Sequence, residues 1–523
     1  MISIERKLSV SDFNGQFLLS QDEKIICDKW HVQDLNGWAL SHHDSLRLIE
    51  VTSNDATGDC IGWFLGWPIN SSGELIYEST IAPFTKAGIA RTDQLETFLY
   101  CHGGRWIFIS GTAELPRIYL DPCGSLALVY ALSGRQIAST TTLMSSDAKF
   151  GHRWLETGVE EFPGTNQFFP LGLTGDKKIA RLMPNHYLDL RTNKPVRHWP
   201  LNDIPRVNTA KETAELIDTI VSHVKNNLKA LAGDAQLYLS LTAGRDSRML
   251  LACSKEIRDR ISCFTFSDQL GTGPIDLELA KHICQHVDLP HETVPLASVG
   301  TALRDEYLRR IGYAGNAGKA ADFLQAAGKY LDPSKIWLIG YAGEVGRSFY
   351  WLKNDTKDTK IDPANLLQRM NLPSTPQFIE PMKAWITDLD SLDFYGLLDM
   401  MYLELRMGTW AAPHLYGCAP IRGVIVPLCH RGIMEAMLKL PVEYRWQQNL
   451  ANDVIRTAWP ELLQIPFQRM PGAYGLWLYV KDNKIAPRIN RYIDLLGTLR
   501  GRSRTYDTLY NTARSIYRGI RKQ

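Results

Sequence analysis

The pattern of apolar and polar positions changes near residue 205, and it predicts a different architecture on each side. Before that point, short apolar or alternating runs are separated by Gly, Asn, Asp and Pro, at residues 61–68, 106–111, 117–120, 126–132 and 136–140. Such runs are typical of strands in a mainly antiparallel β layer. After it, Asn208 and Thr209 can cap a helix, and the apolar residues between 216 and 231 follow a period of 3.6.

The second half of the chain predicts a parallel sheet. Residues 236–241 and 261–266 are short apolar strand candidates, and each is followed by a loop and an apolar helical segment. Strand, loop and helix in this order indicate right-handed βαβ units. Beyond residue 295 the pattern is largely helical, interrupted by the strand candidate 336–339 and its glycine loop. We therefore expect an α/β protein with a domain boundary near 200–207.

Length and charge refine this division. A chain of 523 residues is longer than one hydrophobic core usually serves, so two or three domains are expected. The net charge of +2 hides a basic C-terminal tail, 484–523, which holds ten Lys or Arg against two Asp. Such a tail can contact a partner protein, a membrane surface or nucleic acid, or it can be a solvated helix pair. We favour the solvated helix pair or a frayed tail, keep a partner protein as the alternative, and expect no specific nucleic-acid binding.

Cysteine usage and hydropathy bear on the compartment. The nine cysteines are odd in number and contain no C-x-x-C pair, which argues against a disulfide framework and against a zinc site. The N-terminus leads into no apolar leader segment, and nowhere do eighteen apolar residues run together. We therefore expect a cytoplasmic protein without a transmembrane segment.

The loop at residues 242–247 is the first candidate for chemistry. It follows a buried strand and precedes a helix, so it offers free backbone N–H groups and the positive end of the helix dipole, and both attract phosphate. Asp246 would repel a bare phosphate, but its carboxylate is a suitable ligand for Mg²⁺. A plain turn capped by Asp246 or Ser247 is the competing interpretation.

Three segments then point to a known family. Residues 239–247 resemble the S-G-G-x-D-S pyrophosphate loop of asparagine synthetase-like enzymes, which are N-type ATP pyrophosphatases, although Thr242 and Ala243 replace the family's Ser and Gly. Residues 263–268, with Asp276 and His291, look like the family's second strand and helix. Residues 339–345 resemble its later G-x-G-G-D-E loop, with Glu344 in place of Asp.

The resemblance implies ATP and Mg²⁺ as cofactors. It implies that Asp246 and Glu344 hold the metal ion. The nucleotide-binding residues that it implies are Leu239, Ser240, Thr242, Ala243, Gly244, Arg245, Asp246, Ser247, Phe266, Gly340 and Gly343.

The first half resembles a class II glutamine amidotransferase domain in residues 121–130, 137–140 and 184–199. This implies an αββα Ntn-hydrolase-like β-sandwich at 1–205, followed by an ATP-pyrophosphatase domain with helical additions at 206–483. The amidotransferase requires an N-terminal cysteine whose α-amine activates its thiol, whereas residue 2 here is Ile2 and the first cysteine is Cys27. We therefore expect an inactive glutaminase domain, as in β-lactam synthetase and lasso-peptide cyclases.

By this resemblance the chain is an ATP-dependent carbon–nitrogen ligase. It would adenylate a small-molecule or peptide carboxylate, release pyrophosphate, and transfer the acyl group to an amine, releasing AMP. The implied catalytic residues are Tyr341, Glu404 and Arg469. Tyr341 and Glu404 match a proton-transfer pair, and Arg469 falls near the family's late cation, a role for which Arg245 and Arg248 compete. Glu404 has a structural alternative, an ion pair with Arg406 or Arg422.

Two other functions stay open at the level of sequence. One is an amidotransferase that uses free ammonia to amidate a sugar acid or another small carboxylate. The other is a non-catalytic scaffold that keeps the fold and the nucleotide pocket.

Overall fold

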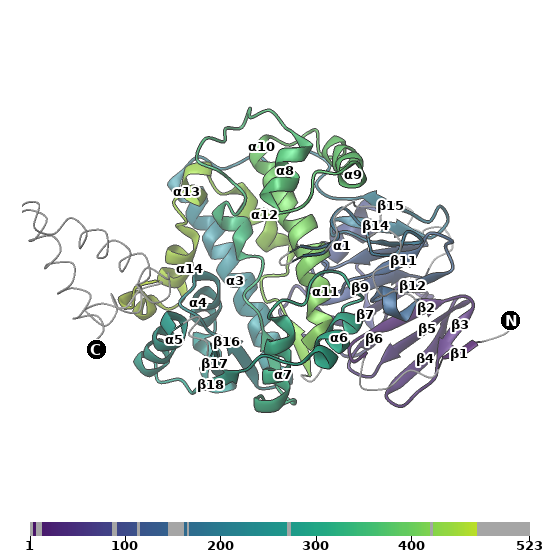
Figure 1. Ribbon diagram of the computed structural model, residues 1–523, viewed down its shortest axis with the longest axis horizontal. Coiled ribbons are helices and arrows are strands. Elements are labelled where there is room, and N and C mark those ends of the chain that lie inside the picture. The colour runs from purple at the N-terminus through teal and green to yellow at the C-terminus, as the bar shows by residue number, and fades with distance from the viewer. Residues whose placement is uncertain are drawn as a thin grey trace, which may run out of the picture.

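The computed structural model describes residues 4–6, 13–85, 92–111, 116–144, 162–164, 167–268, 274–418 and 422–467. It is a mixed α/β structure with two largely antiparallel sheets in the first 200 residues and a parallel sheet after them. Figure 1 shows the antiparallel strands packed on one side of the molecule, with the helices and the parallel sheet on the other. The basic tail lies outside the described residues.

The two antiparallel sheets account for the alternating runs in the sequence. The seven-stranded sheet consists, in order, of β15 (Lys194–Arg197), β14 (His186–Asp189), β10 (Arg117–Leu120), β9 (Gly103–Ser110), β7 (Cys60–Ile69), β6 (Arg47–Thr52) and β8 (Thr80–Ile81). The six-stranded sheet consists of β13 (Ile179–Arg181), β11 (Val129–Ala131), β12 (Gln136–Ala138), β2 (Phe17–Ser20), β5 (Trp38–His43) and β4 (Trp30–Leu35). A further pair joins β1 (Ile4–Arg6) to β3 (Glu23–Ile25).

Alternation along β2 shows why these sheets face each other. Phe17 and Leu19 join the same apolar cluster as Ile107 of β9, whereas Leu18 between them packs with Leu143 in a separate cluster. Successive side chains of a strand point to opposite faces, so the first cluster is the core between the sheets.

Helices cover this sandwich unevenly. Leu95 of α1 (Thr92–Tyr100) packs with Phe64 and Phe108 on the outer face of the seven-stranded sheet. On the outer face of the six-stranded sheet, the described residues contribute the 3₁₀ turn η3 (Thr141–Leu143) and no α-helix. The expected αββα arrangement has two helical layers. Within the described residues one of them is present, formed by α1.

The parallel sheet is formed as predicted. Its strand order is β18 (His291–Leu296), β17 (Ile261–Asp268), β16 (Leu237–Ser240), β19 (Ile336–Leu338) and β20 (Gly423–Ile425), and every described pair is parallel. The chain leaves β16 to form β17 and β18 on one side, then returns to form β19 on the other. The loops after β16 and β19 therefore diverge, and in open α/β sheets ligands bind in the crevice at such a point.

The helix before this sheet also follows its sequence signals. Thr209 caps α3 (Ala210–Asp234) by accepting from the backbone N–H of Glu212, and the Glu212 side chain bonds back to Thr209, which is a complete capping box. The other helices are α4 (Arg245–Cys253), α5 (Pro274–His286), α6 (Thr301–Arg310), α7 (Ala320–Tyr330), α8 (Pro363–Arg369), α9 (Pro376–Thr387), α10 (Phe394–Met400), α11 (Ala412–His414), α12 (Arg431–Lys439), α13 (Val442–Trp446) and α14 (Leu450–Ala458). Short 3₁₀ segments are η4 (Lys255–Arg260), η5 (Gly343–Arg347), η7 (Leu415–Cys418) and η8 (Pro460–Gln464).

One segment has an uncommon backbone. Residues Met401–Ala411 form a π-helix, η6, between α10 and α11. π-helices often lie at functional sites, because the extra residue per turn changes which side chains share a face. Here η6 carries Tyr402, Glu404 and Trp410, whose positions are described below.

The two halves are packed together rather than joined by a free linker. Trp67 and Phe168 from the first half belong to the same apolar cluster as Leu239 and Trp385 from the second. The predicted boundary falls between β15 and α3, and the division into domains stays a prediction.

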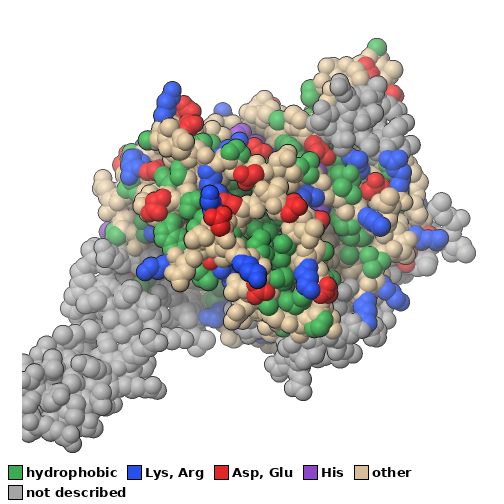
Figure 2. All heavy atoms as spheres, turned by 90° about the horizontal axis from the view of Figure 1, so that it is seen from above, with side chains coloured by type: hydrophobic (Ala, Val, Ile, Leu, Met, Phe, Trp, Pro, Cys, Tyr) green, Lys and Arg blue, Asp and Glu red, His purple; other side chains and the backbone are tan. Residues whose placement is uncertain are grey.

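The surface seen from above carries Lys and Arg side chains interspersed with Asp and Glu and with apolar groups (Figure 2). Within the described residues, no helix is long and apolar enough to cross a membrane.

Candidate active site

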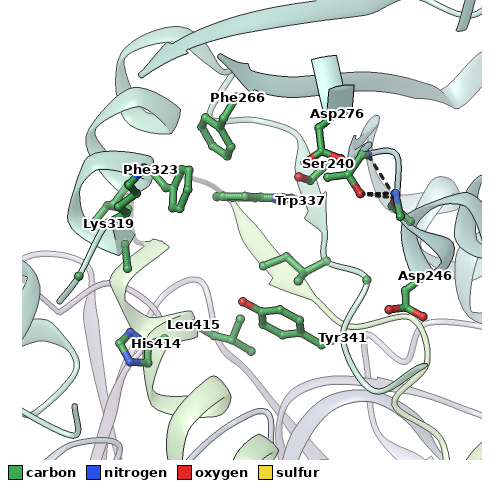
Figure 3. Close-up of a pocket in the computed structure, with 18 of the residues that line it drawn as sticks. Ser240, Asp246, Phe266, Asp276, Lys319, Phe323, Trp337, Tyr341, His414 and Leu415 are labelled. Carbon is green, nitrogen blue, oxygen red and sulfur yellow. Dashed lines mark hydrogen bonds between the residues drawn. The ribbon is translucent and has the colours of Figure 1, made fainter. Parts of the chain in front are cut away.

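A cavity of about 710 Å³ opens where the loops after β16 and β19 diverge. Of the predicted nucleotide-binding residues, those that line it are Ser240, Thr242, Gly244, Arg245, Asp246, Ser247, Phe266 and Gly340. Asp246 lies at one end of this space and Lys319, Phe323 and His414 at the other, with Trp337 and Tyr341 between them (Figure 3).

The loop after β16 is held by its own hydroxyl groups. Ser247 Oγ accepts from the backbone N–H of Thr242 at 3.2 Å, and Thr242 Oγ1 accepts from that of Gly244 at 3.1 Å. Gly244 caps α4 without a side chain, so the N-terminal end of the helix faces the cavity uncovered by its own cap. Backbone N–H groups and the helix dipole make this end a suitable site for an anion.

Leu239, Ala243 and Gly343 do not line the cavity. The side chain of Leu239 is fully buried in the apolar core. The N–H of Ala243 donates to Asp276 Oδ1 at 2.7 Å, so it is already paired, and Asp276 itself lines the cavity.

Glycines bring the loop after β19 against the start of α4. A Cβ on Gly340 would lie 3.1 Å from the backbone nitrogen of Ser247, and a Cβ on Gly343 would lie 2.4 Å from Asp246 Oδ1. The second distance is shorter than any normal contact of a carbon atom. Gly343 thus contributes by its lack of a side chain, because it lets Glu344 approach Asp246.

The two predicted metal ligands are brought together by a third residue. Nη2 of Arg347 donates to Asp246 Oδ2 at 2.5 Å and to Glu344 Oε1 at 2.9 Å. The hydroxyl of Tyr402, from η6, donates to Glu344 Oε2 at 2.5 Å. Neither Arg347 nor Tyr402 was predicted. The E-V-G-R spacing from Glu344 to Arg347 is a local signal. Tyr402 lies 58 residues after Glu344, so no local spacing connects the two.

Electrostatics distinguishes Asp246 from an ordinary surface carboxylate. Burial, and then the nearby charge of Glu344, raise the pKa of Asp246 to about 6, although Arg347 acts in the opposite direction. The same contacts raise the pKa of Arg347, and burial followed by Glu344 raises that of Tyr402. Two buried carboxylates that repel each other are a typical cation site.

The chemistry of this pair fits Mg²⁺ in part. Carboxylate oxygens are the ligands that the ion prefers, and Asp246 Oδ1 is buried with no hydrogen-bond partner among the described residues. The other three oxygens of the pair are already bonded to Arg347 or Tyr402. No cluster of three or more His, Cys, Asp or Glu suited to a metal ion occurs in the described part of the chain.

Away from Asp246 the cavity is lined by aromatic side chains, of which Trp337, Phe323 and Trp410 were not predicted. Trp337 and Phe323 are both packed with Phe266, and Trp410 of η6 lies under the guanidinium of Arg406 at 3.7 Å. Tyr341, a predicted catalytic residue, lines the cavity beside Trp410, with 6.5 Å between their ring centroids.

His414 faces the same end of the cavity. Its Nδ1 is hydrogen-bonded to the hydroxyl of Tyr307. Burial lowers the pKa of His414 to about 3, so its imidazole is neutral near pH 7. Lys319 adds a cationic side chain to this end.

Glu404 is not part of this site, which corrects the prediction. Its fully buried carboxylate accepts two bonds from Arg197, at 2.5 and 2.9 Å, one from Asn185 at 2.9 Å and one from Trp385 at 2.8 Å. Its ion-pair partner is also neither Arg406, which stacks on Trp410, nor Arg422, which pairs with Asp234 at 2.8 Å. The π-helix points Glu404 toward Asn185 and Arg197 of the first half of the chain, while Tyr402 points toward Glu344.

The three arginines considered as the phosphate-binding cation lie in different surroundings. Arg248 is fully buried and donates to the carbonyl of Ile465, so it supports the fold. Arg245 lines the cavity beside Asp246. Arg469 lies outside the described residues, and its role stays a prediction.

No family model matches the chain, and no curated protein matches it in sequence. Among solved structures, NMN synthetase from Francisella tularensis is similar over 40% of this chain and 94% of that chain, with 9% sequence identity and a TM-score of 0.18. A likeness of this size carries no argument about function.

Proposed function

We propose that the protein is an ATP-dependent ligase that adenylates a carboxylate and transfers the acyl group to an amine, without hydrolysing glutamine. The observation that supports it best is the convergence of the three motif segments on one cavity. The N-terminal end of α4, Phe266 at the end of β17, and Gly340 with Tyr341 after β19 all line it. Parallel topology brings such loops to one edge of the sheet, and their motif residues share the cavity there.

The residues suggest a division of labour along the cavity. Backbone N–H groups at the start of α4, with Arg245 and Arg347, would bind the phosphates and stabilise the departing pyrophosphate. A bound Mg²⁺ would be held by Asp246 and Glu344 and would neutralise phosphate charge. The aromatic residues at the other end would shield the acyl-adenylate from water.

The second step requires a place for the proton of the attacking amine. The amine nitrogen forms a bond to the acyl carbon, the bond from that carbon to AMP breaks, and the amine proton must pass to a base. Tyr341 stays the proposed proton-transfer residue, because it lies between the phosphate end and the aromatic end. Glu404 is not available to assist it, since four hydrogen bonds hold its carboxylate elsewhere.

ATP–pyrophosphate exchange tests this proposal. A carboxylate substrate should stimulate exchange, and Asp246→Asn should reduce the rate by about 100- to 1,000-fold, because one charged ligand of the phosphate end is lost. Asp332→Asn is the matched control, since this exposed residue lies outside the cavity. Absence of exchange with every candidate acid, despite calorimetric binding of Mg·AMP-CPP, would rule out the ligase.

A non-catalytic nucleotide-binding scaffold is the second candidate. It is favoured by Arg347, which already neutralises the two carboxylates that a catalytic metal would need. A scaffold would bind Mg·AMP-CPP and show no exchange, so the same pair of measurements separates the two functions.

A further inference from the structure

Arg347 lies where a metal ion would be expected to join Asp246 to Glu344. A single nitrogen, Nη2, contacts one oxygen of each carboxylate, at 2.5 and 2.9 Å. All three side chains are largely shielded from solvent, with 26% of the Arg347 side chain and 11% and 15% of the two acidic side chains exposed. The bridge is therefore much less screened than a surface ion pair.

The rest of the site leaves little room for a second cation. Tyr402 donates to the remaining oxygen of Glu344, and the remaining oxygen of Asp246 is buried close to Gly343, with no hydrogen-bond partner among the described residues. A divalent ion bound by both carboxylates needs at least one oxygen from each. In this arrangement such an ion can bridge the pair only if Arg347 leaves it.

Arg347 also has an alternative anion close by. It lines the same cavity as Arg245 and the start of α4, where the phosphates of the proposed nucleotide would lie. A guanidinium binds phosphate as well as it binds carboxylate, because its N–H groups match both geometries. Loss of the carboxylate contacts would therefore be offset once a nucleotide is bound.

We propose that Arg347 is the resident cation of the Asp246–Glu344 pair and exchanges with the divalent ion, so that metal binds weakly alone and strongly with nucleotide. The inference rests on the proposed nucleotide site and adds that metal and nucleotide bind to it cooperatively. Metal and nucleotide each increase the affinity for the other, since both favour the arrangement in which Arg347 has turned to the phosphates.

Binding of Mn²⁺ to the full-length protein, followed by electron paramagnetic resonance, tests the exchange. Without nucleotide, Arg347→Met should bind Mn²⁺ at least about tenfold more tightly than the wild type, because a positive charge within hydrogen-bond distance of both ligands is removed. Arg245→Met is the matched control: it removes an equal charge from the same cavity and leaves the bridge intact, so a change below about threefold is expected. Addition of AMP-CPP should tighten Mn²⁺ binding by at least about tenfold in the wild type and by much less in Arg347→Met.

Any other result would contradict the proposal that Arg347 exchanges with the divalent ion. Equal gains in both arginine variants would mean that general electrostatics controls metal affinity. Tight Mn²⁺ binding by the wild type alone would mean that Arg347 does not compete. Arg347→Gln provides a second variant if the methionine protein does not fold, and the wild-type coupling to AMP-CPP needs no variant. Failure of AMP-CPP to bind at all would remove the proposed function, while the nucleotide-free titrations would still decide whether Arg347 and metal compete.

Discussion

Two buried acidic clusters use side chains from the π-helix η6, and they differ in how fully their charges are paired. In the first, Glu404 accepts four hydrogen bonds from Arg197, Asn185 and Trp385. In the second, Asp246 and Glu344 share one guanidinium and one hydroxyl, and Asp246 keeps a buried oxygen without a partner among the described residues. The hydrogen bonding of the Glu404 carboxylate is complete, whereas that of the Asp246–Glu344 pair is not.

The pKa values follow this difference. Burial alone would raise the pKa of Glu404, yet Arg197 and the hydrogen bonds hold it below its ordinary value. Burial together with Glu344 raises the pKa of Asp246. A carboxylate whose bonds are all made supports the fold, whereas an incompletely paired one beside a cavity is a candidate for binding and catalysis.

The largest effect is expected from the complete cluster. Glu404→Ala should lower the free energy of unfolding by about 3–5 kcal/mol, because it leaves Arg197 buried without its counter-charge. Urea unfolding measures the loss, and Glu443→Ala, at an exposed position, should stay within about 0.5 kcal/mol of the wild type. If Glu404→Ala left stability unchanged but abolished ATP–pyrophosphate exchange, Glu404 would again be a candidate catalytic residue. The distinction between a structural and a functional carboxylate would then be refuted.

Adding a single methyl group next to the Asp246–Glu344 pair should reduce activity. In Gly343→Ala the new carbon would lie 2.4 Å from Asp246 Oδ1, so Glu344 and Asp246 must separate. The rate of ATP–pyrophosphate exchange should fall by about 10- to 100-fold, which is about 1.4–2.7 kcal/mol of transition-state stabilisation. Gly233→Ala near the end of α3 has no heavy atom within 4 Å and should leave exchange unchanged, with stability equal or up to about 1 kcal/mol higher.

The smallest effect is a difference in pH dependence. Asp246 has a folded-state pKa of about 6 against 3.8 for the free side chain, so the native state binds the extra proton between these values. Its favourable contribution is therefore present at low pH and lost as the pH rises through about 6. Asp246→Asn should melt about 2–4 °C above the wild type at pH 7.5, and the difference should shrink toward pH 4.5.

Glu404 should behave in the opposite way. Its folded-state pKa lies below the ordinary value of 4.5, so its contribution is present above that pH and is lost as the pH falls through the folded value. The penalty of Glu404→Gln should therefore be largest near neutral pH and smaller in acid. Thermal unfolding of both variants between pH 4 and 7.5 compares the two carboxylates directly, and parallel curves would contradict the comparison.

Local signals in the sequence predicted much of the fold. The helix cap at Thr209, the strands predicted at 236–241, 261–266 and 336–339, and the loop before α4 each depend on a few neighbouring residues, and each has a counterpart in the structure. The same signals placed Asp246, Ser247 and Gly340 at the cavity, because loops at the carboxyl ends of adjacent parallel strands meet.

Contacts between distant segments were not accessible in this way. Glu404 was assigned to the site by resemblance to a proton-transfer pair, but its direction depends on the π-helix and on Arg197, 207 residues away. Leu239 was assigned from its place in a motif, although its side chain is fully buried in the core. Trp410 reaches the cavity, and Tyr402 reaches Glu344, from a π-helix whose backbone type no local pattern indicates.

The sequence by itself determined the α/β class, three strands of the parallel sheet and the loops that face the crevice, because periodicity and turn chemistry act over a few residues. The tertiary structure alone decided which charges meet. Whether a buried carboxylate is fully paired depends on every donor that packing brings within about 3 Å of it, and those donors come from distant parts of the chain. That is why Asp246 could be predicted as a binding residue, while its bridge to Glu344 through Arg347 became visible only in the folded protein.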